Sequence, residues 1–253
     1  MKKRIFALFL SVLLLATVLC ACGDTKQEEA GGVGSDGTSS SGAVVDGGEM
    51  VVGIAQDLGD SLDPYQMTAA GTREVLFNIY EGLVKPNASG EYVPAVASES
   101  TVSEDGLTYT FPLREGVLFH NGAAVTTDDV IYSFKTCAET TVDTALAEAL
   151  SSVKDITADG NTVTVTLKEA NPDFLSYVGM VYIVPADYTD EATAPVGTGP
   201  FKFVSRSVQE NLIVEKFADY WGEKAHLDKV TFKIYEDANA LMSALSAGSV
   251  DMA

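Results

Sequence analysis

Few residues of this 253-residue chain have the types and spacings that catalysis or metal binding requires. The only histidines are His120 and His226, and the cysteines form no C-x-x-C pair, so we expect no metal site. The adjacent acids Asp128 and Asp129 resemble an acid/base pair, but at the start of a predicted helix they are more typical of residues that favour its dipole. The sequence has no nucleophile elbow, phosphate loop or H-E-x-x-H helix. We therefore expect no catalytic residues and no cofactor, and we expect His120 to make a turn-stabilising hydrogen bond.

The clearest chemistry belongs to Cys22. Residues 2–4 are basic, residues 5–21 are uncharged and mostly apolar, and the run ends in the letters LCAC, which resemble a bacterial lipobox. We expect residues 1–21 to be a lipoprotein signal peptide, Cys22 to be the lipidated mature N-terminus, and Cys20 to leave with the signal. A transmembrane anchor is the alternative, but the run is shorter than the roughly 20 residues that span a bilayer.

The segment 22–48 is rich in Gly, Ser and acidic residues and has little apolar surface to bury, so we predict a flexible tether. Lipid and tether together would hold the protein at the outer face of the cytoplasmic membrane, on the periplasmic side or the cell surface. Asp and Glu number 36 against 16 Lys and Arg, a net charge of −20, which disfavours nucleic acid as a partner.

The chain from Glu49 onward mixes strand and helix patterns, which predicts a mixed α/β (α+β) fold. Turn signals at 104–106 and 159–161 predict two hairpins. A helix is predicted at 72–83 with Thr72 as its cap, and another begins at Thr126 and buries Cys137 on its apolar face. Strand-like runs lie at 50–55, 98–102, 107–113, 153–156, 163–167, 201–204, 212–214 and 230–234, and a last helix at 238–247.

Several short motifs recur at long range along this part of the chain. The longest is LREGVLFHNG at 113–122, followed by VTTDDVIYSF at 125–134. Shorter motifs are LDP at 62–64, YEGL at 80–83, GTGPF at 197–201, DYWG at 219–222 and LSAGSVD at 245–251. In this order they resemble the family 5 extracellular solute-binding proteins, the receptors of oligopeptide, dipeptide and nickel ABC importers.

The resemblance implies a two-lobed clamshell of the periplasmic-binding-protein type II kind. It assigns residues 49–80 to the first part of lobe I, 81–179 to an inserted subdomain and 180–253 to the second part of lobe I. Lobe II is then expected to be missing, as in a fragment. The resemblance also implies a monomer that captures an extracytoplasmic solute and delivers it to permease subunits in the membrane. Peptide is the favoured solute, and no bond is made or broken.

The resemblance directs attention to the loop after the first strand as a wall of the ligand cleft. Small residues in that loop would let a peptide main chain approach and pair like an added strand. Two tyrosines flank the return to lobe I. The candidate ligand-binding residues are Tyr65, Gln66, Met67, Thr68, Ala69, Ala70, Tyr177 and Tyr182.

Packing is the alternative role for several of these candidates. Tyr65 and Met67 could lie under the helix that follows them, and Tyr177 and Tyr182 could pack at the domain junction. Trp221, in the DYWG turn, is expected to be a structural anchor.

The ligand itself stays open between peptide, nickel chelate, sugar and other solutes. Two other functions also stay open: a surface lipoprotein that acts in signalling, adhesion or as a holdase, and a secreted hydrolase.

Overall fold

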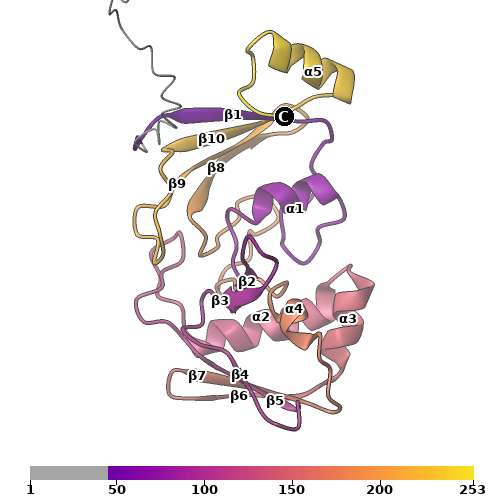
Figure 1. The fold of residues 1–253 in the computed structure, drawn as a ribbon, viewed down its shortest axis with the longest axis vertical. Coiled ribbons are helices and arrows are strands. Elements are labelled where there is room, and N and C mark those ends of the chain that lie inside the picture. Colours follow the sequence, from indigo (N-terminus) through magenta and orange to yellow (C-terminus); the bar gives the residue numbers. More distant parts are fainter. Residues whose placement is uncertain (1–44) are drawn as a thin grey trace, which may run out of the picture. The chain divides into compact units, whose positions relative to one another are not determined.

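The computed structural model describes residues 45–253 (Figure 1). The predicted signal peptide, Cys22 and all but the last residues of the predicted tether lie outside the described residues. The described part is mixed α/β, as the sequence predicts, and its buried apolar side chains form a continuous core. No helix within residues 45–253 has the length and apolar character needed to cross a membrane.

The first sheet, called sheet 1, joins the two ends of the described chain. Its strands are β1 (Glu49–Ile54), β10 (Lys229–Ile234), β9 (Asn211–Lys216) and β8 (Phe201–Ser207), in that spatial order. β1 pairs in parallel with β10, and the other neighbours are antiparallel. All four strands were expected from their apolar runs.

The other edge of β1 is occupied by the end of the chain. The amide of Gly53 donates to the carbonyl of Met252 at 2.8 Å, and the amide of Asp251 donates to the carbonyl of Val51 at 2.8 Å. Helix α5 (Ala238–Ser246) leads to this segment and lies beside β1 (Figure 1).

The second sheet, called sheet 2, consists of the two predicted hairpins. Its spatial order is β4 (Thr101–Val102), β5 (Thr108–Pro112), β7 (Thr162–Leu167) and β6 (Val153–Asp159), all antiparallel. The two turns contain Gly106 and Gly160, whose φ values of 70° and 57° are left-handed conformations that glycine adopts without strain. The turn residues were therefore a correct signal for both hairpins.

Helix α2 (Thr127–Thr140) packs on sheet 2 and begins where the sequence predicts. Thr126 and Asp129 form a capping box, in which each side chain accepts a hydrogen bond from the other residue's backbone amide. Cys137 is fully buried on the inner face, and burial raises the pKa of its thiol to about 12. Cys137 is thus a core residue, as expected.

The helix predicted at 72–83 is wrong in extent. Helix α1 spans Ala70–Leu76, and Thr72 is not its cap, because the Thr72 hydroxyl lies buried and accepts a hydrogen bond from the Gly59 amide at 2.8 Å. Beyond the helix, the carbonyls of Asn78 and Ile79 accept hydrogen bonds from the 199–201 segment instead of continuing the helix.

The apolar spacing of the predicted helix still has a physical meaning. Val75, Leu76, Ile79 and Leu83 are all fully buried, although only the first two are helical. The chain after them forms β2 (Val84–Pro86), which pairs with β3 (Tyr92–Pro94). The pattern therefore identified the buried residues but not their secondary structure.

Three further elements were not predicted. They are the β2–β3 hairpin, α3 (Thr144–Ser151) and α4 (Phe174–Val178). Helix α3 has a clear cap, since the Asp143 carboxylate accepts hydrogen bonds from the amides of Ala145 and Leu146. Its length of two turns leaves little periodicity to detect.

Candidate functional site

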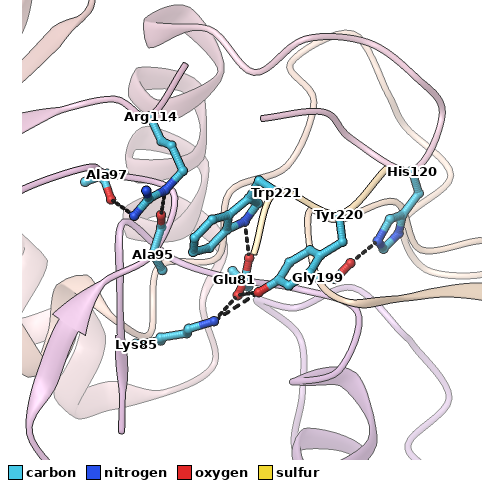
Figure 2. Close-up of polar contacts among 9 residues, drawn as sticks. All are labelled: Glu81, Lys85, Ala95, Ala97, Arg114, His120, Gly199, Tyr220 and Trp221. Carbon is cyan, nitrogen blue, oxygen red and sulfur yellow. Dashed lines mark hydrogen bonds and ion pairs between the residues drawn. The ribbon is translucent and has the colours of Figure 1, made fainter. Parts of the chain in front are cut away.

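The YEGL, LREGV and DYWG motifs meet in a buried polar cluster around Glu81 (Figure 2). The Glu81 side chain is buried, and three donors surround its carboxylate. Lys85 Nζ lies 2.6 Å and the Tyr220 hydroxyl 2.7 Å from Oε1, while Trp221 Nε1 donates to Oε2 at 2.8 Å. We call Glu81, Lys85, Tyr220 and Trp221 the Glu81 cluster. Trp221 is a structural anchor, as the sequence analysis expects.

Arg114 connects this cluster to the chain before sheet 2. Its guanidinium lies over the Trp221 ring, 4.2 Å from the ring centre, and its Nε donates to the Ala95 carbonyl at 3.1 Å (Figure 2). An arginine that stacks on an indole and bonds a carbonyl makes contacts that a lysine does not reproduce. The arginine of the LREGV motif therefore has a framework role.

His120 provides a second long-range connection. Its Nδ1 accepts a hydrogen bond from the Gly197 amide at 3.2 Å, so the proton lies on Nε2. Nε2 donates to the Gly199 carbonyl at 3.0 Å (Figure 2). Burial lowers the pKa of the imidazole to about 4, and protonation would also remove the Nδ1 acceptor. The His120 ring thus joins its loop to the distant 197–199 segment, so the prediction that it stabilises its own turn is wrong.

The GTGPF motif is explained by close backbone contact. A Cβ atom on Gly197 would lie 2.2 Å from the Ile79 carbonyl oxygen, and one on Gly199 would lie 2.5 Å from the Asn78 carbonyl oxygen. Only glycine permits this approach without displacing backbone. Both oxygens of the Glu81 carboxylate also have donors, so the Glu81 cluster and the glycine contacts together form a packed framework.

An open groove lies on another part of the molecule, beside α1. It has a volume of about 510 Å³. We call it the α1 groove, and its lining residues are Met67, Thr68, Ala69, Ala70, Arg73, Glu74, Phe77 and Tyr182. The groove therefore brings together five of the eight residues that the sequence analysis names as ligand candidates.

The other three candidates lie outside the groove lining. Tyr65 is 3% exposed and its hydroxyl donates to the Tyr182 carbonyl at 2.6 Å, which supports the backbone of a lining residue from below. Gln66 Nε2 donates to the Thr140 carbonyl, and Tyr177 packs against the core from α4. The ligand roles of all eight residues stay predictions.

The sequence analysis missed three lining residues, Arg73, Glu74 and Phe77. They share the solvent-exposed side of α1 and its C-cap, and Phe77 is 58% exposed. An exposed phenylalanine one helical turn after an arginine is a signal that an analysis of buried periodicity overlooks.

Within residues 45–253, the structure contains no group of three or more His, Cys, Asp or Glu side chains placed to hold a metal ion. The groove offers instead one cation, one carboxylate, two aromatic rings and small side chains. Such a surface can bind a solute through polar ends and apolar contact.

Comparison with known sequences identifies the family. The profile described as "Bacterial extracellular solute-binding proteins, family 5 Middle" matches residues 91–253. The chain therefore belongs to family 5 of the bacterial extracellular solute-binding proteins, as its motifs indicated. The family consists of binding proteins and not of enzymes.

Particular relatives show the range of the family. The chain is 30% identical to the nickel-binding periplasmic protein of Escherichia coli over 69% of its length, and 28% identical to the oligopeptide-binding protein AppA of Bacillus subtilis over 99%. Among solved structures, 81% of the chain superimposes on a DppA protein of Helicobacter pylori in complex with the peptide STSA, with a TM-score of 0.73 and 33% identity.

The chain spans less than half the length of each of these proteins. It covers 35% of the nickel-binding protein, 48% of AppA and 46% of the solved DppA chain. The type II binding-protein fold of the solved relative agrees with the mixed α/β class expected from the sequence.

Proposed function

We propose that this protein is the substrate-binding component of an ABC importer. It captures an extracytoplasmic solute and delivers it to permease subunits, and peptides are the favoured class of solute. The observation that supports the proposal is the α1 groove, whose lining includes five of the proposed ligand residues, Met67, Thr68, Ala69, Ala70 and Tyr182. Family membership supports the transport role, and the peptide-binding relatives support the choice of solute.

The backbone of the groove wall has amide groups that could donate to a peptide. Within residues 45–253, the amides of Thr68 and Ala69 donate no hydrogen bond, although the Ala69 carbonyl accepts from Thr72. Successive amides of an extended segment point to opposite sides, so a peptide carbonyl would accept from one of these two amides, while peptide side chains contact Phe77 and Tyr182.

Isothermal titration of the protein produced from its complete gene tests this proposal. We expect heat of binding and a raised melting temperature with a mixture of tri- to pentapeptides. Parallel titrations with nickel–histidine and with oligosaccharides separate the solute classes. Binding of one of those solutes without any binding of peptide would contradict the peptide assignment, and no binding of any of them would contradict the receptor function.

We further propose that Cys22 carries a lipid that holds the protein at the outer face of the cytoplasmic membrane. The lipobox and the predicted signal peptide support this anchor. In cells, Cys22→Ala is expected to move the protein from the membrane fraction to the soluble fraction and to abolish palmitate labelling. Cys20→Ala is the matched control and should change neither, whereas membrane retention of the Cys22 variant would contradict the anchor.

The strand arrangement supports the proposed division of the chain. Sheet 1 takes its strands from the segments 49–80 and 180–253, and sheet 2 takes all of its strands from 81–179. We propose that these segments correspond to lobe I and its inserted subdomain, in a protein that acts as a monomer.

A further inference from the structure

Arg73 is the only cationic side chain that lines the α1 groove in the described residues 45–253. The side chain is 47% exposed, and it projects from the same helix whose first residue, Ala70, belongs to the groove wall. Phe77 lies one helical turn further along. An arginine and a phenylalanine therefore stand side by side at the surface of the groove.

The single ion pair of Arg73 is weak in its geometry. Arg73 Nη2 lies 3.4 Å from Asp143 Oδ2, the longest separation among the ion pairs of residues 45–253, whose other members lie at 2.6 to 3.1 Å. Asp143 also has another task, since its Oδ1 accepts the hydrogen bonds that cap α3. The contact to Asp143 involves only Nη2, whereas the guanidinium has five N–H donors, so most of its donors remain available to a ligand.

We propose that Arg73 recognises a carboxylate of the bound solute. The planar fork of a guanidinium matches the two oxygens of a carboxylate in a bidentate pair, which is stronger and more directional than the long contact to Asp143. The apolar part of the solute would then lie against Phe77. This inference rests on the proposed function, and it defines the solute class as carboxylate-bearing.

The carboxylate has two possible sources in a peptide, the C-terminus or an acidic side chain. Three peptide pools separate them: free-acid tetrapeptides without Asp or Glu, the same peptides as C-terminal amides, and amidated peptides that contain one Glu. Affinities are measured by titration calorimetry on the protein produced from its complete gene. We expect either the first or the third pool to bind at least about tenfold more tightly than the second.

Two variants distinguish recognition from a structural role. Arg73→Gln should abolish the preference for the carboxylate, so that the carboxylate-bearing pool binds no more tightly than the amidated pool without Asp or Glu. Asp143→Asn removes the charge of the partner but keeps an oxygen that can cap α3, so the preference should persist or increase. If Arg73 served only to hold α1 near α3, both variants would change binding in the same way. Lys224→Gln, at an exposed site outside the groove, is the matched control.

The outcomes separate this inference from the proposed function. Equal binding of all three pools by the wild-type protein, or a preference that survives Arg73→Gln, would overturn the role of Arg73 while leaving the receptor function in place. Absence of binding of every pool would overturn the peptide assignment itself, and the role of Arg73 with it. If Arg73→Gln does not fold, loss of the preference in Asp143→Asn would overturn the inference.

Discussion

The Glu81 cluster and the α1 groove differ in how fully their polar groups are used. Around Glu81, every carboxylate oxygen has a donor and the nearby glycines allow backbone contact that no other residue permits. Along the groove, the amides of Thr68 and Ala69 have no partner within residues 45–253, and the one ion pair is long. The first region is complete by itself, and the second has capacity for a ligand.

This difference shows why the family could be identified more easily than the ligand. The motifs YEGL, LREGV, GTGPF and DYWG all supply residues of the packed region, where a change of residue would break a specific contact. The groove residues only have to suit one solute. The recognisable motifs therefore identify the packed framework of the family, whereas the residues that select the solute form no comparable sequence motif.

The largest effect on stability is expected for Glu81→Ala. The substitution leaves the Tyr220 hydroxyl and Trp221 Nε1 without an acceptor in a buried site, so we expect the free energy of unfolding to fall by about 3 kcal/mol. Urea denaturation measures it, with Glu104→Ala at an exposed turn as control. A loss below about 1 kcal/mol would show that the cluster is not a framework.

A second test adds one methyl group where the backbones touch. The Cβ atom of Gly197→Ala would overlap the Ile79 carbonyl oxygen, so we expect a loss of about 2 kcal/mol. In Gly71→Ala the nearest atom to the new Cβ lies at 3.9 Å, and this helical site should be neutral or slightly stabilised. Equal stabilities of the two variants would contradict the close-contact explanation.

Local sequence signals predict some elements of this fold and fail for others. The cap at Thr126 and the glycine turns are local signals, and the helix and hairpins they predict are present. The spacing of Ile79 and Leu83 also predicts burial, but long-range hydrogen bonds to the 199–201 segment replace the expected helix. Tertiary contacts of that kind cannot be read from a local window.

The same limit applies to the groove. The loop 65–70 was found through the family resemblance, and five of the eight predicted site residues lie together. Arg73 and Phe77 were missed because they lie on the exposed side of a helix that the analysis described by its buried side. Tyr65 was predicted to contact ligand as a residue of this loop, and tyrosine is a common ligand contact. In the structure its side chain is buried and its hydroxyl donates to the Tyr182 carbonyl, and only the tertiary packing determines this position.

A pH-dependent effect is expected at Glu191, a buried carboxylate that accepts hydrogen bonds from the Tyr80 hydroxyl and the Val196 amide. Burial raises the pKa of the Glu191 carboxyl from 4.5 to about 7. The folded state then binds a proton that the unfolded chain releases at lower pH, so stability from this group falls as the pH rises from 4.5 to 7.

Glu191→Gln removes this dependence. The free energy of unfolding of the variant minus that of the wild type should rise by about 2 kcal/mol from pH 4.5 to pH 7. Urea denaturation of both proteins at pH 4.5, 5.5 and 7 measures this difference. The lowered pKa of His120 makes stability rise with pH, but both proteins contain His120, so its contribution cancels in the difference. Stability curves that stay parallel over this range would contradict the raised pKa.

The smallest effect on stability is expected in the groove. Thr68→Trp places a large side chain at an exposed position of the groove wall, so the free energy of unfolding should change by no more than about 0.5 kcal/mol. Peptide affinity should nevertheless fall at least about tenfold, a loss of about 1.4 kcal/mol of binding free energy. Thr157→Trp, exposed on β6, is the control and should leave binding unchanged. Full affinity in the Thr68 variant would exclude the groove as the binding site.

Hydrogen–deuterium exchange on the protein from its complete gene, with and without bound peptide, tests the contrast between the two regions most directly. We expect peptide to slow exchange in residues 66–77 and around Tyr182, and to leave residues 78–85 and 219–222 unchanged, because those two segments lie outside the groove lining. Slower exchange confined to segments outside the α1 groove, in a protein that does bind the peptide, would contradict the account.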